Sequence, residues 1–508
     1  MASDGLVDAF GRDRAKQRSQ TLLQPGRNCW RIARADRASI IVDAADYYRL
    51  AKRALLKARR QVILIGWDFD TRIYLDRNDP DDDVAGEAPN ELGKLIQWLA
   101  DRRPELRIYI LKWDVGALKL LGRGTTLFCL ACWTWYKGIT FKLDGAHPKG
   151  ASHHQKILVI DDAVAFCGGI DMTADRWDTR EHQHHDPGRR RPTTRRRYGP
   201  WHDATMAVDG DVAKALGELA RRRWFSAVGR QLPTPQTDED IWPSRLEPQF
   251  RNVSLAVART LGSYKHQQEV RENERLFIVL IGSARHFIYA ENQYFASRVI
   301  AEAIARRLEA RDGFEFVLVN PKTADGWLEE EVMGSARAEL LRWLGPIFDD
   351  HFKIYTPVNN AGDDIYVHAK IMIVDDTVLR VGSSNMNNRS MGLDSECDLA
   401  LDAGYPGNAA AGPVIERIRL DLMAEHLGTT ANEVRLVLAE TGSLIRTIEK
   451  LRGTGAALRP FSPPHLAQME KVIIQSEALD PESSRKSFEP ITRNRLTGAV
   501  RQTASCLG

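Results

Sequence analysis

The chain has 508 residues, of which 43% are hydrophobic and 27% charged, and its net charge is +3. This composition is typical of a globular protein with more than one domain, and it excludes a strongly basic or acidic chain that selects partners by overall charge. The N-terminal segment lacks an apolar signal-peptide core, and no window approaches the ~18–20 apolar residues of a membrane span. We therefore expect a cytoplasmic or peripheral membrane protein, with export without a cleaved signal peptide as the alternative.

Helix and strand patterns alternate along the first half of the chain. Residues 43–60 predict a capped helix, and residues 61–67 predict a buried strand. Residues 90–106 predict a second helix, and residues 107–113 a second strand. The segment ITFKLDG, residues 139–145, comes next.

The second half repeats this order. Residues 286–295 predict a strand, residues 297–313 a helix and residues 314–321 a further strand, followed by FKIYTPV at residues 352–358. A segment rich in proline and acidic residues, 229–243, is the best candidate for a linker between the halves.

The repeated alternation predicts an α/β fold made of two similar α/β sandwich units that arose by internal duplication, each with a parallel or mixed sheet covered on both faces. The predicted domains are an N-terminal extension (1–28), a first unit (29–235), a second unit (236–430) and a helical and polar C-terminal extension (431–508).

One short pattern, H-x-K-x-x-x-x-D, occurs in both halves, as HHQKILVIDD and as HAKIMIVDD. Alternate side chains of a strand share a face, so His154 and Lys156 point the same way, and so do His368 and Lys370. An imidazole beside an ammonium group at the start of a buried strand is unfavourable without an anionic partner. A phosphate supplies that partner, because lysine gives a point charge and histidine gives a second donor or a nucleophile.

Glycines follow both motifs, in GGID of the first half and GSSN of the second. Glycine permits a close approach of the backbone at the next strand or turn. Asp171 and Asn385 fall at matching places, where Asp171 could orient a cation and Asn385 could donate to an oxygen. The difference between the two segments argues against two interchangeable half-sites. The candidate orienting or phosphate-binding residues of these segments are Gly168, Gly169, Asp171, Gly382, Ser383 and Asn385.

The paired motif resembles that of the phospholipase D superfamily, and the resemblance extends over residues 29–427. It includes the segments GWDFD, YGPWHDATMAVDG, AENQYF and NMNNRSMGLDSECDLAL. Together these segments are more similar to phosphatidylcholine-type phospholipases D than to the nucleases of the superfamily.

The resemblance implies that the two motifs meet at a pseudo-two-fold interface and form one active site. It implies that His154 is the nucleophile and His368 the general acid and base, and that Lys156, Lys370 and Asn385 hold the phosphate oxygens. Two histidines are needed, because a nucleophile must be unprotonated while an acid must be protonated.

Each imidazole needs a carboxylate that orients it through the other ring nitrogen. The family pattern implies Glu396 for His368 and Asp203 for His154, with Asp178 as the fallback for His154. The motif aspartates, Asp161 and Asp375, lie at the strand ends, and we expect them to be structural or to pair with the lysines rather than to act as acids.

The implied function is hydrolysis of the distal phosphodiester of glycerophospholipids through a phosphohistidine, with transfer to alcohols. A cardiolipin-synthase-like phosphatidyltransferase is the alternative, and a phosphodiesterase acting on nucleic acid ranks below it. The expected partners are a phospholipid at a membrane surface and a water or alcohol acceptor, with no nucleic acid, for a monomeric chain. The resemblance implies no cofactor and no metal.

Three further segments leave alternatives open. The histidines of REHQHHDPG (His182, His184 and His185) have no standard metal-ligand spacing, so we expect no metal there. The arginine-rich run 189–197 suits either a solvated loop or attraction to anionic headgroups. The aromatic segment 126–138 suits either core packing or a lipid-contacting lip.

Overall fold

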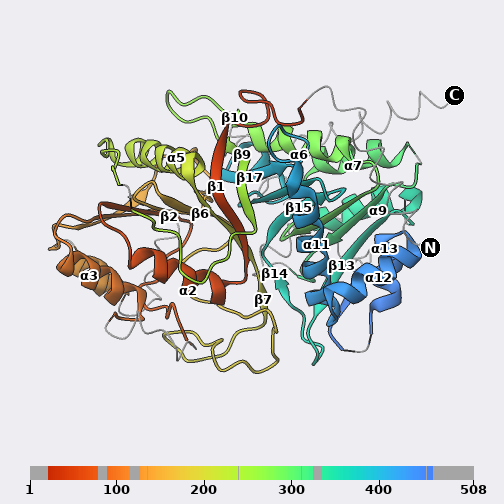
Figure 1. Ribbon diagram of the computed structural model, residues 1–508, viewed down its shortest axis with the longest axis horizontal. Coiled ribbons are helices and arrows are strands. Elements are labelled where there is room, and N and C mark those ends of the chain that lie inside the picture. Colours follow the sequence, from red (N-terminus) through yellow and green to blue (C-terminus); the bar gives the residue numbers. More distant parts are fainter. Residues whose placement is uncertain are drawn as a thin grey trace.

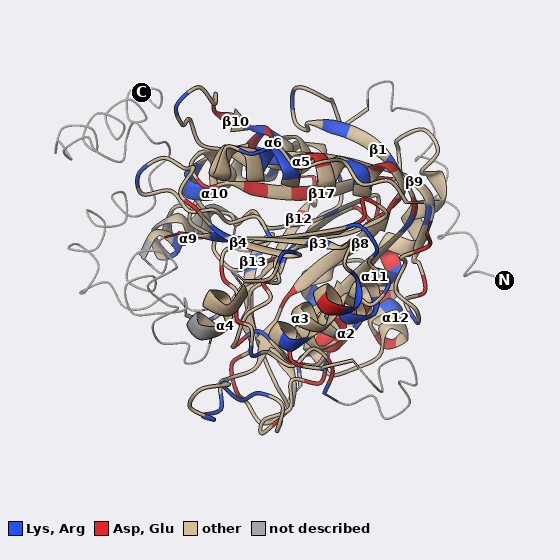
Figure 2. Ribbon diagram, turned by 90° about the vertical axis from the view of Figure 1, so that its left-hand side faces the viewer, with Lys and Arg blue, Asp and Glu red and all other residues tan. Residues whose placement is uncertain are grey.

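The computed structural model describes residues 21–77, 88–114, 126–133, 135–237, 239–310, 312–323, 335–348, 350–453 and 455–461. In these ranges, no helix has both the length and the apolar character needed to cross a membrane. Lys and Arg are mixed with Asp and Glu over the described ribbon (Figure 2), in keeping with the small net charge.

The first half alternates strands and helices and ends in a long helix, α5. Its elements are β1 (Arg31–Val42), α2 (Ala44–Leu55), β2 (Gln61–Gly66), α3 (Leu92–Arg102), β3 (Arg107–Trp113), α4 (Thr126–Trp133), β4 (Ile139–Asp144), β5 (Ile157–Ile160), β6 (Val164–Gly168), β7 (Trp201–His202), β8 (Ala204–Asp209) and α5 (Gly210–Val228). The helices and strands predicted for this half are all present, with helix ends a few residues inside the predicted bounds.

The second half repeats the pattern and continues into a helical C-terminal part. Its elements are β9 (Phe250–Leu261), β10 (Val270–Arg271), α6 (Glu272–Ser283), β11 (Phe287–Asn292), α7 (Arg298–Leu308), β12 (Glu315–Val319), α9 (Ser335–Phe348), β13 (Phe352–Val358), β14 (Tyr366–Val367), β15 (Lys370–Val374), β16 (Val378–Gly382), α10 (Asn388–Gly392), β17 (Glu396–Asp402), η4 (Ala409–Ala411), α11 (Gly412–Leu427), α12 (Ala431–Thr441), α13 (Leu444–Leu451) and β18 (Ala457–Pro460).

The two halves share one 16-stranded mixed sheet, and they meet where β1 pairs antiparallel with β9 (Figure 1). Read outward from this central pair, the first half runs β1-β8-β6-β5-β2-β3-β4 and the second runs β9-β17-β16-β15-β11-β12-β13. The outer three strands are parallel in both halves, and the inner ones are antiparallel. The matching order confirms the α/β fold and the duplicated arrangement.

The sheet is buried on both faces, and one of its cores is common to both halves. Helices α5 and α11 cover the shared core, whereas the opposite face has one core with α2 and α3 and another with α6 and α7. Strand β5 shows the consequence of this layering: Ile157 and Val159 belong to the shared core, and Leu158 and Ile160 to the other face. Burial on both faces explains why the motif strands read as continuous apolar runs.

The predicted domain boundaries remain a prediction, although several contacts cross them. Leu23, in the predicted N-terminal extension, packs in the core of the second half. In the predicted C-terminal extension, β18 adds an antiparallel strand to β13, and residues 462–508 lie outside the described residues.

Candidate active site

Each H-x-K motif leads into an antiparallel hairpin near the middle of its half-sheet. Strand β5 pairs with β6 after the first motif, and β15 pairs with β16 after the second. The histidines precede these strands, at the ends that face the other half. Short backbone contacts between the halves hold both of them there.

These contacts are equivalent in the two halves. The amide of His154 donates to the carbonyl of Ser395 at 3.0 Å, and the amide of His368 donates to the carbonyl of His202 at 2.7 Å. Strand β14, just before His368, pairs in parallel with β7, and a parallel bridge joins His153 to Ser395. Each motif is therefore fixed next to a carboxylate of the opposite half, Glu396 at the start of β17 or Asp203 between β7 and β8.

The orienting carboxylates are consequently exchanged relative to the sequence prediction, which was wrong on this pairing. The Nδ1 atom of His154 lies 3.0 Å from Oε2 and 3.1 Å from Oε1 of Glu396, and Nδ1 of His368 lies 2.7 Å from Oδ2 of Asp203. The physical reason is the crossed pairing of the backbone: Ser395 precedes Glu396 and His202 precedes Asp203. Asp178, the fallback, instead accepts from the Trp201 amide and from Arg189.

Both histidines are held in their neutral form. The pKa of His154 lies well below its ordinary value, because the ring is desolvated and lies near Lys156 and Lys370. The pKa of His368 is lowered in the same way by desolvation, by Lys370 and by Arg176. With Nδ1 turned toward a carboxylate, the Nε2 atom is the nitrogen that each ring can offer to a substrate.

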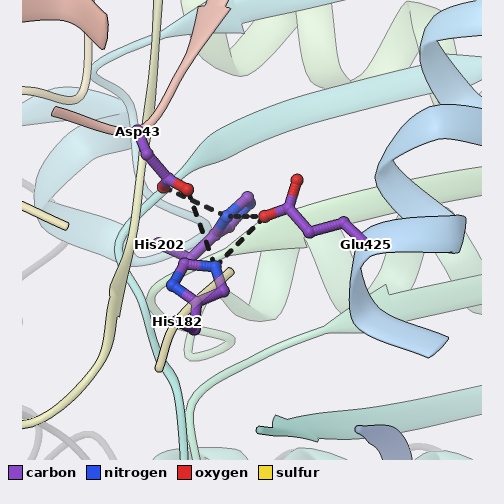
Figure 3. A group of neighbouring side chains, drawn as sticks. All are labelled: Asp43, His182, His202 and Glu425. Atoms are coloured by element: carbon purple, nitrogen blue, oxygen red, sulfur yellow. Dashed lines mark hydrogen bonds and ion pairs between the residues drawn. The ribbon is translucent and has the colours of Figure 1, made fainter. Parts of the chain in front are cut away.

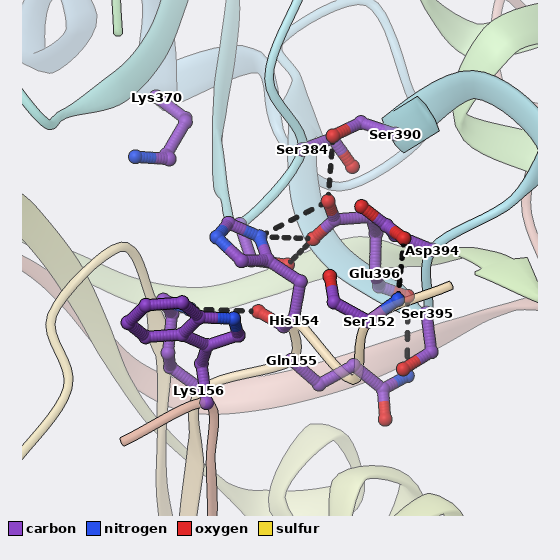
Figure 4. Close-up of polar contacts among 12 residues, drawn as sticks. Ser152, His154, Gln155, Lys156, Lys370, Ser384, Ser390, Asp394, Ser395 and Glu396 are labelled. Carbon is purple, nitrogen blue, oxygen red and sulfur yellow. Dashed lines mark hydrogen bonds and ion pairs between the residues drawn. The ribbon is translucent and has the colours of Figure 1, made fainter. Parts of the chain in front are cut away.

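Glu396 is held by two hydroxyl donors beside His154 (Figure 4). Its Oε2 accepts from Ser383 Oγ at 2.5 Å, and its Oε1 accepts from Ser390 Oγ at 2.7 Å. Burial raises the pKa of Glu396 well above its ordinary value, and burial raises that of Asp203 to about 7. Ser383 was predicted as an orienting or phosphate-binding residue, and its hydroxyl donates to the orienting carboxylate.

The two motif lysines have different surroundings, although both are buried. Lys156 forms an ion pair with Asp171 at 3.1 Å, which is the cation-orienting position expected for that aspartate. Lys370 donates to the Gln293 side-chain oxygen at 3.3 Å, and desolvation lowers its pKa to about 7. The matching residue of the second half, Asn385, is buried, and its Oδ1 accepts no hydrogen bond from any described residue.

The motif aspartates lie at the far ends of the strands and have a structural role. Asp161 accepts from the amides of residues 59, 60 and 61, and Asp375 accepts from the amides of residues 285, 286 and 287. Both have positive φ angles, 53° and 49°, in the tight turns that close the two hairpins. Among the described residues, neither aspartate forms an ion pair with a motif lysine, so of the two predicted roles, structural or lysine-pairing, the contacts favour the structural one.

The glycines after the motifs allow neighbouring strands and side chains to come close. A Cβ atom on Gly168 would lie 2.4 Å from the Cα of Thr205, and one on Gly382 would lie 1.9 Å from Asp398 Oδ1. A Cβ on Gly169 would lie 2.1 Å from Asp203 Oδ1 and 3.2 Å from the carbonyl oxygen of His368. Gly169 thus leaves room for the carboxylate that orients His368.

Several site residues escaped the sequence analysis. The ring of Trp201 stacks on Tyr366 with centroids 4.5 Å apart and lies 5.2 Å from the ring of His368, and Arg176 lies over the Trp201 ring. Trp201 belongs to YGPWHD, the segment that carries Asp203. Its place beside Asp203 was the feature of the sequence that could have identified it as a site residue. No local sequence pattern indicates that Ser390 contacts Glu396.

The three open segments have different outcomes. His182 is buried, whereas His184 and His185 are exposed. In the arginine-rich run, Arg189 is buried against Asp178, and the other five arginines are exposed. In the aromatic segment, Trp133 is buried and Trp135 is 88% exposed.

Comparison with known proteins identifies the family. A family model described as Phospholipase D matches residues 54–301 and 349–471, and one described as Cardiolipin synthase, PLD-like domain, matches residues 277–407. The chain is 24% identical to phospholipase D alpha 1 of Vigna unguiculata, over 88% of this chain and 72% of that protein. It is 25% identical to phospholipase D A of Dictyostelium discoideum, over 79% of this chain and 36% of that protein.

Among solved structures, the fold is similar to that of phosphatidylserine synthase from Haemophilus influenzae. The TM-score is 0.51 at 13% sequence identity, and the match covers 76% of this chain and 88% of that one. The paired motifs, the duplicated sheet and a family model that spans most of the sequence lead to one conclusion: the chain belongs to the phospholipase D family of enzymes.

Proposed function

We propose that the chain hydrolyses the distal phosphodiester of glycerophospholipids, giving phosphatidate and a free headgroup, and that it transfers the phosphatidyl group to alcohols. The observation that carries this proposal is the pair of neutral histidines, each oriented by a carboxylate of the opposite half and both near the motif lysines. The matches to phospholipases D support the lipid substrate.

In the first step, Nε2 of His154 attacks phosphorus. A P–N bond forms, the P–O bond to the headgroup breaks, and the departing oxygen takes a proton from His368. In the second step, His368 removes a proton from water or an alcohol, whose oxygen attacks the same phosphorus and releases His154. The assignment of His154 as nucleophile rests on the family resemblance.

The free protein holds both rings neutral, so His368 must gain a proton before it can act as the acid. A bound phosphodiester brings a negative charge next to Lys156 and Lys370, and this charge offsets the repulsion by which the lysines lower the pKa of His368. Substrate binding therefore favours the protonated ring. The same lysines stabilise the charge on the phosphate oxygens in the transition state.

The test is incubation of the purified chain with phosphatidylcholine vesicles and ethanol. We expect release of choline together with phosphatidylethanol, since an alcohol can replace water at the phosphohistidine. With ³²P-labelled lipid, quenching should trap label on His154, which peptide mapping identifies. Absence of both products with several headgroups would contradict the proposal, and label on His368 would reverse the two roles.

A phosphatidyltransferase of the cardiolipin-synthase type is the second candidate, since that family model matches residues 277–407. Such an enzyme joins two phosphatidylglycerol molecules and releases glycerol. Phosphatidylglycerol as the sole lipid separates the candidates by their main product: the transferase gives mainly a lipid with two phosphates, whereas the hydrolase, for which water is the main acceptor, gives mainly phosphatidate. The substrate of either reaction lies in a bilayer, so we propose that the chain acts at a membrane surface.

A further inference from the structure

Outside the candidate active site, four buried side chains of different segments point toward one another (Figure 3). They are Asp43 before α2, His182 in the loop after β6, His202 on β7 and Glu425 on α11. One ligand atom from each lies within 4.8 Å of the others. We propose that this four-residue cluster is a structural site for a divalent transition metal of the zinc type.

The spacing of the inner atoms suits such an ion. The Nε2 atom of His182 lies 3.1 Å from Glu425 Oε1 and 3.6 Å from Asp43 Oδ2. The Nδ1 atom of His202 lies 3.0 Å from Glu425 Oε1 and 3.3 Å from Asp43 Oδ1. Ligands at the zinc–nitrogen and zinc–oxygen distances of a tetrahedral site are roughly 3.3 Å apart.

Nδ1 of His202 and Oδ2 of Asp43 make no well-formed hydrogen bond to any described residue, and the groups that face them are the other members of the cluster, Glu425 at 3.0 Å and His182 at 3.6 Å. Both side chains are almost completely buried, with 0% and 1% exposure. A buried polar atom that lacks a well-formed hydrogen bond costs free energy that a bound ion would remove. A bound ion at the centre of the cluster would replace these incomplete contacts with metal–ligand bonds.

The outer atoms of the ligands are each held by another group, as is usual around metal-binding histidines. Nδ1 of His182 lies 3.0 Å from Asp178 Oδ2, and Nε2 of His202 lies 2.7 Å from Glu291 Oε2. These carboxylates orient the rings so that the opposite nitrogens face the centre of the cluster. In addition, Arg180 binds Glu425 Oε2, and Asp43 Oδ1, which also faces His202, accepts from the amide of Asp203.

The donor set indicates the class of metal. Two imidazoles with two carboxylates suit zinc and its neighbours, whereas calcium and magnesium prefer sites made only of oxygen ligands. Four protein ligands that leave no open coordination position on the metal are typical of a structural site. Arg180 also lines a surface cavity of about 530 Å³, which brings the outer shell of the cluster close to solvent.

The cluster connects the halves and lies directly behind the active site. Three of its ligands come from the first half, and Glu425 comes from the second. Asp43 is tied to Asp203 by two hydrogen bonds: the amide of Asp43 donates to the carbonyl of Asp203 at 2.7 Å, and the amide of Asp203 donates to Asp43 Oδ1 at 3.0 Å. A metal here would fix β7 and therefore the carboxylate that orients His368.

The test measures metal in the full-length chain, purified without a metal-affinity tag from zinc-supplemented cells. We expect about one zinc per chain, and Co²⁺ replacement should give the visible absorption of tetrahedral cobalt. His182→Ala and Glu425→Gln should lose the metal and the cobalt spectrum. His184→Ala is the matched control, because His184 lies in the same loop but is exposed and pairs with Asp363; it should retain both.

Two further measurements keep the proposal testable if a cluster variant fails to fold. Asp178→Asn, which changes an outer partner, should weaken zinc affinity by roughly 10–100-fold. In ¹⁵N-histidine spectra of the wild type, zinc should bind Nε2 of His182 and Nδ1 of His202. A folded wild type that contains no zinc, gives no cobalt spectrum and shows both rings as imidazolium ions would overturn the proposal.

Discussion

The Nδ1 atom of His154 lies 3.0 Å from Oε2 of Glu396, although 242 residues separate the two in sequence. The equivalent pair, His368 and Asp203, is 165 residues apart. Each reactive ring is therefore oriented by a carboxylate from the other half. Neither half supplies both a motif histidine and the carboxylate that orients it.

This exchange predicts which ring each carboxylate variant disturbs. Glu396→Gln should change the tautomer and ¹⁵N shifts of His154 and leave those of His368 in place, because only His154 contacts Glu396. Asp203→Asn should change the tautomer and ¹⁵N shifts of His368 and leave those of His154 in place. We expect each variant to lower activity by about 10²-fold, which is less than loss of the histidine itself. The opposite assignment of shifts would contradict the crossed pairing.

Gly169→Ala tests the space that the orienting aspartate needs. The new Cβ would lie 2.1 Å from Asp203 Oδ1, so the carboxylate must move away from His368. We expect a loss of kcat of at least about tenfold, with little change in KM and with a folded protein by circular dichroism. Gly199→Ala is the control, since a Cβ there has no neighbour within 4 Å. Equal activity of the two variants would show that the contact is unimportant.

Asp161→Ala separates structure from chemistry within the motif. The variant loses the acceptor of three backbone amides, so we expect the free energy of unfolding to fall by about 1–3 kcal/mol. Activity per folded molecule should stay within a few-fold of the wild type. Urea denaturation and assays below the unfolding transition measure the two effects. His154→Ala should give the reverse result, with stability kept and activity lost.

The activity should depend on pH through Lys370. Desolvation lowers the pKa of this lysine to about 7, so its positive charge is present below that pH and lost above it. We expect kcat/KM to fall as the pH rises through about 7. Lys370→Arg should move this fall to a much higher pH, because arginine keeps its charge. The exposed change Lys214→Arg should leave the profile unchanged.

A fall that stays near pH 7 in Lys370→Arg would contradict this prediction. It would assign the transition to Asp203, whose pKa burial raises to about 7. If the arginine variant turns over too slowly, the pH dependence of inorganic phosphate binding gives the same comparison.

Trp135 tests the open alternative for the aromatic segment. The side chain is 88% exposed, and tryptophan favours the boundary between water and bilayer. Trp135→Ala should weaken binding to phosphatidylcholine vesicles by about tenfold, or about 1.4 kcal/mol. Hydrolysis of a soluble diester should not change. Leu436→Ala, at an exposed apolar residue of α12, is the control. Unchanged vesicle binding would leave Trp135 without a role at the membrane.

Much of the fold follows from local patterns in the sequence. The run QVILIG forms β2 and RIYILKW forms β3, because strands buried on both faces need uninterrupted apolar residues. The repeat of the H-x-K pattern indicated the duplication, and the alternation of strand side chains placed histidine and lysine together. These features depend on neighbours within a few residues, so the sequence by itself determines them.

The tertiary structure alone decided which groups meet across the two halves. Glu396 begins β17 and Asp203 lies directly before β8, and the sequence around each residue does not indicate which histidine it faces. The choice follows from the β1–β9 pairing, which places each motif next to the opposite half. The cluster of Asp43, His182, His202 and Glu425 has the same origin. Its four residues come from separate segments, and long-range packing brings them together. No regular spacing in the sequence therefore marks them as a group.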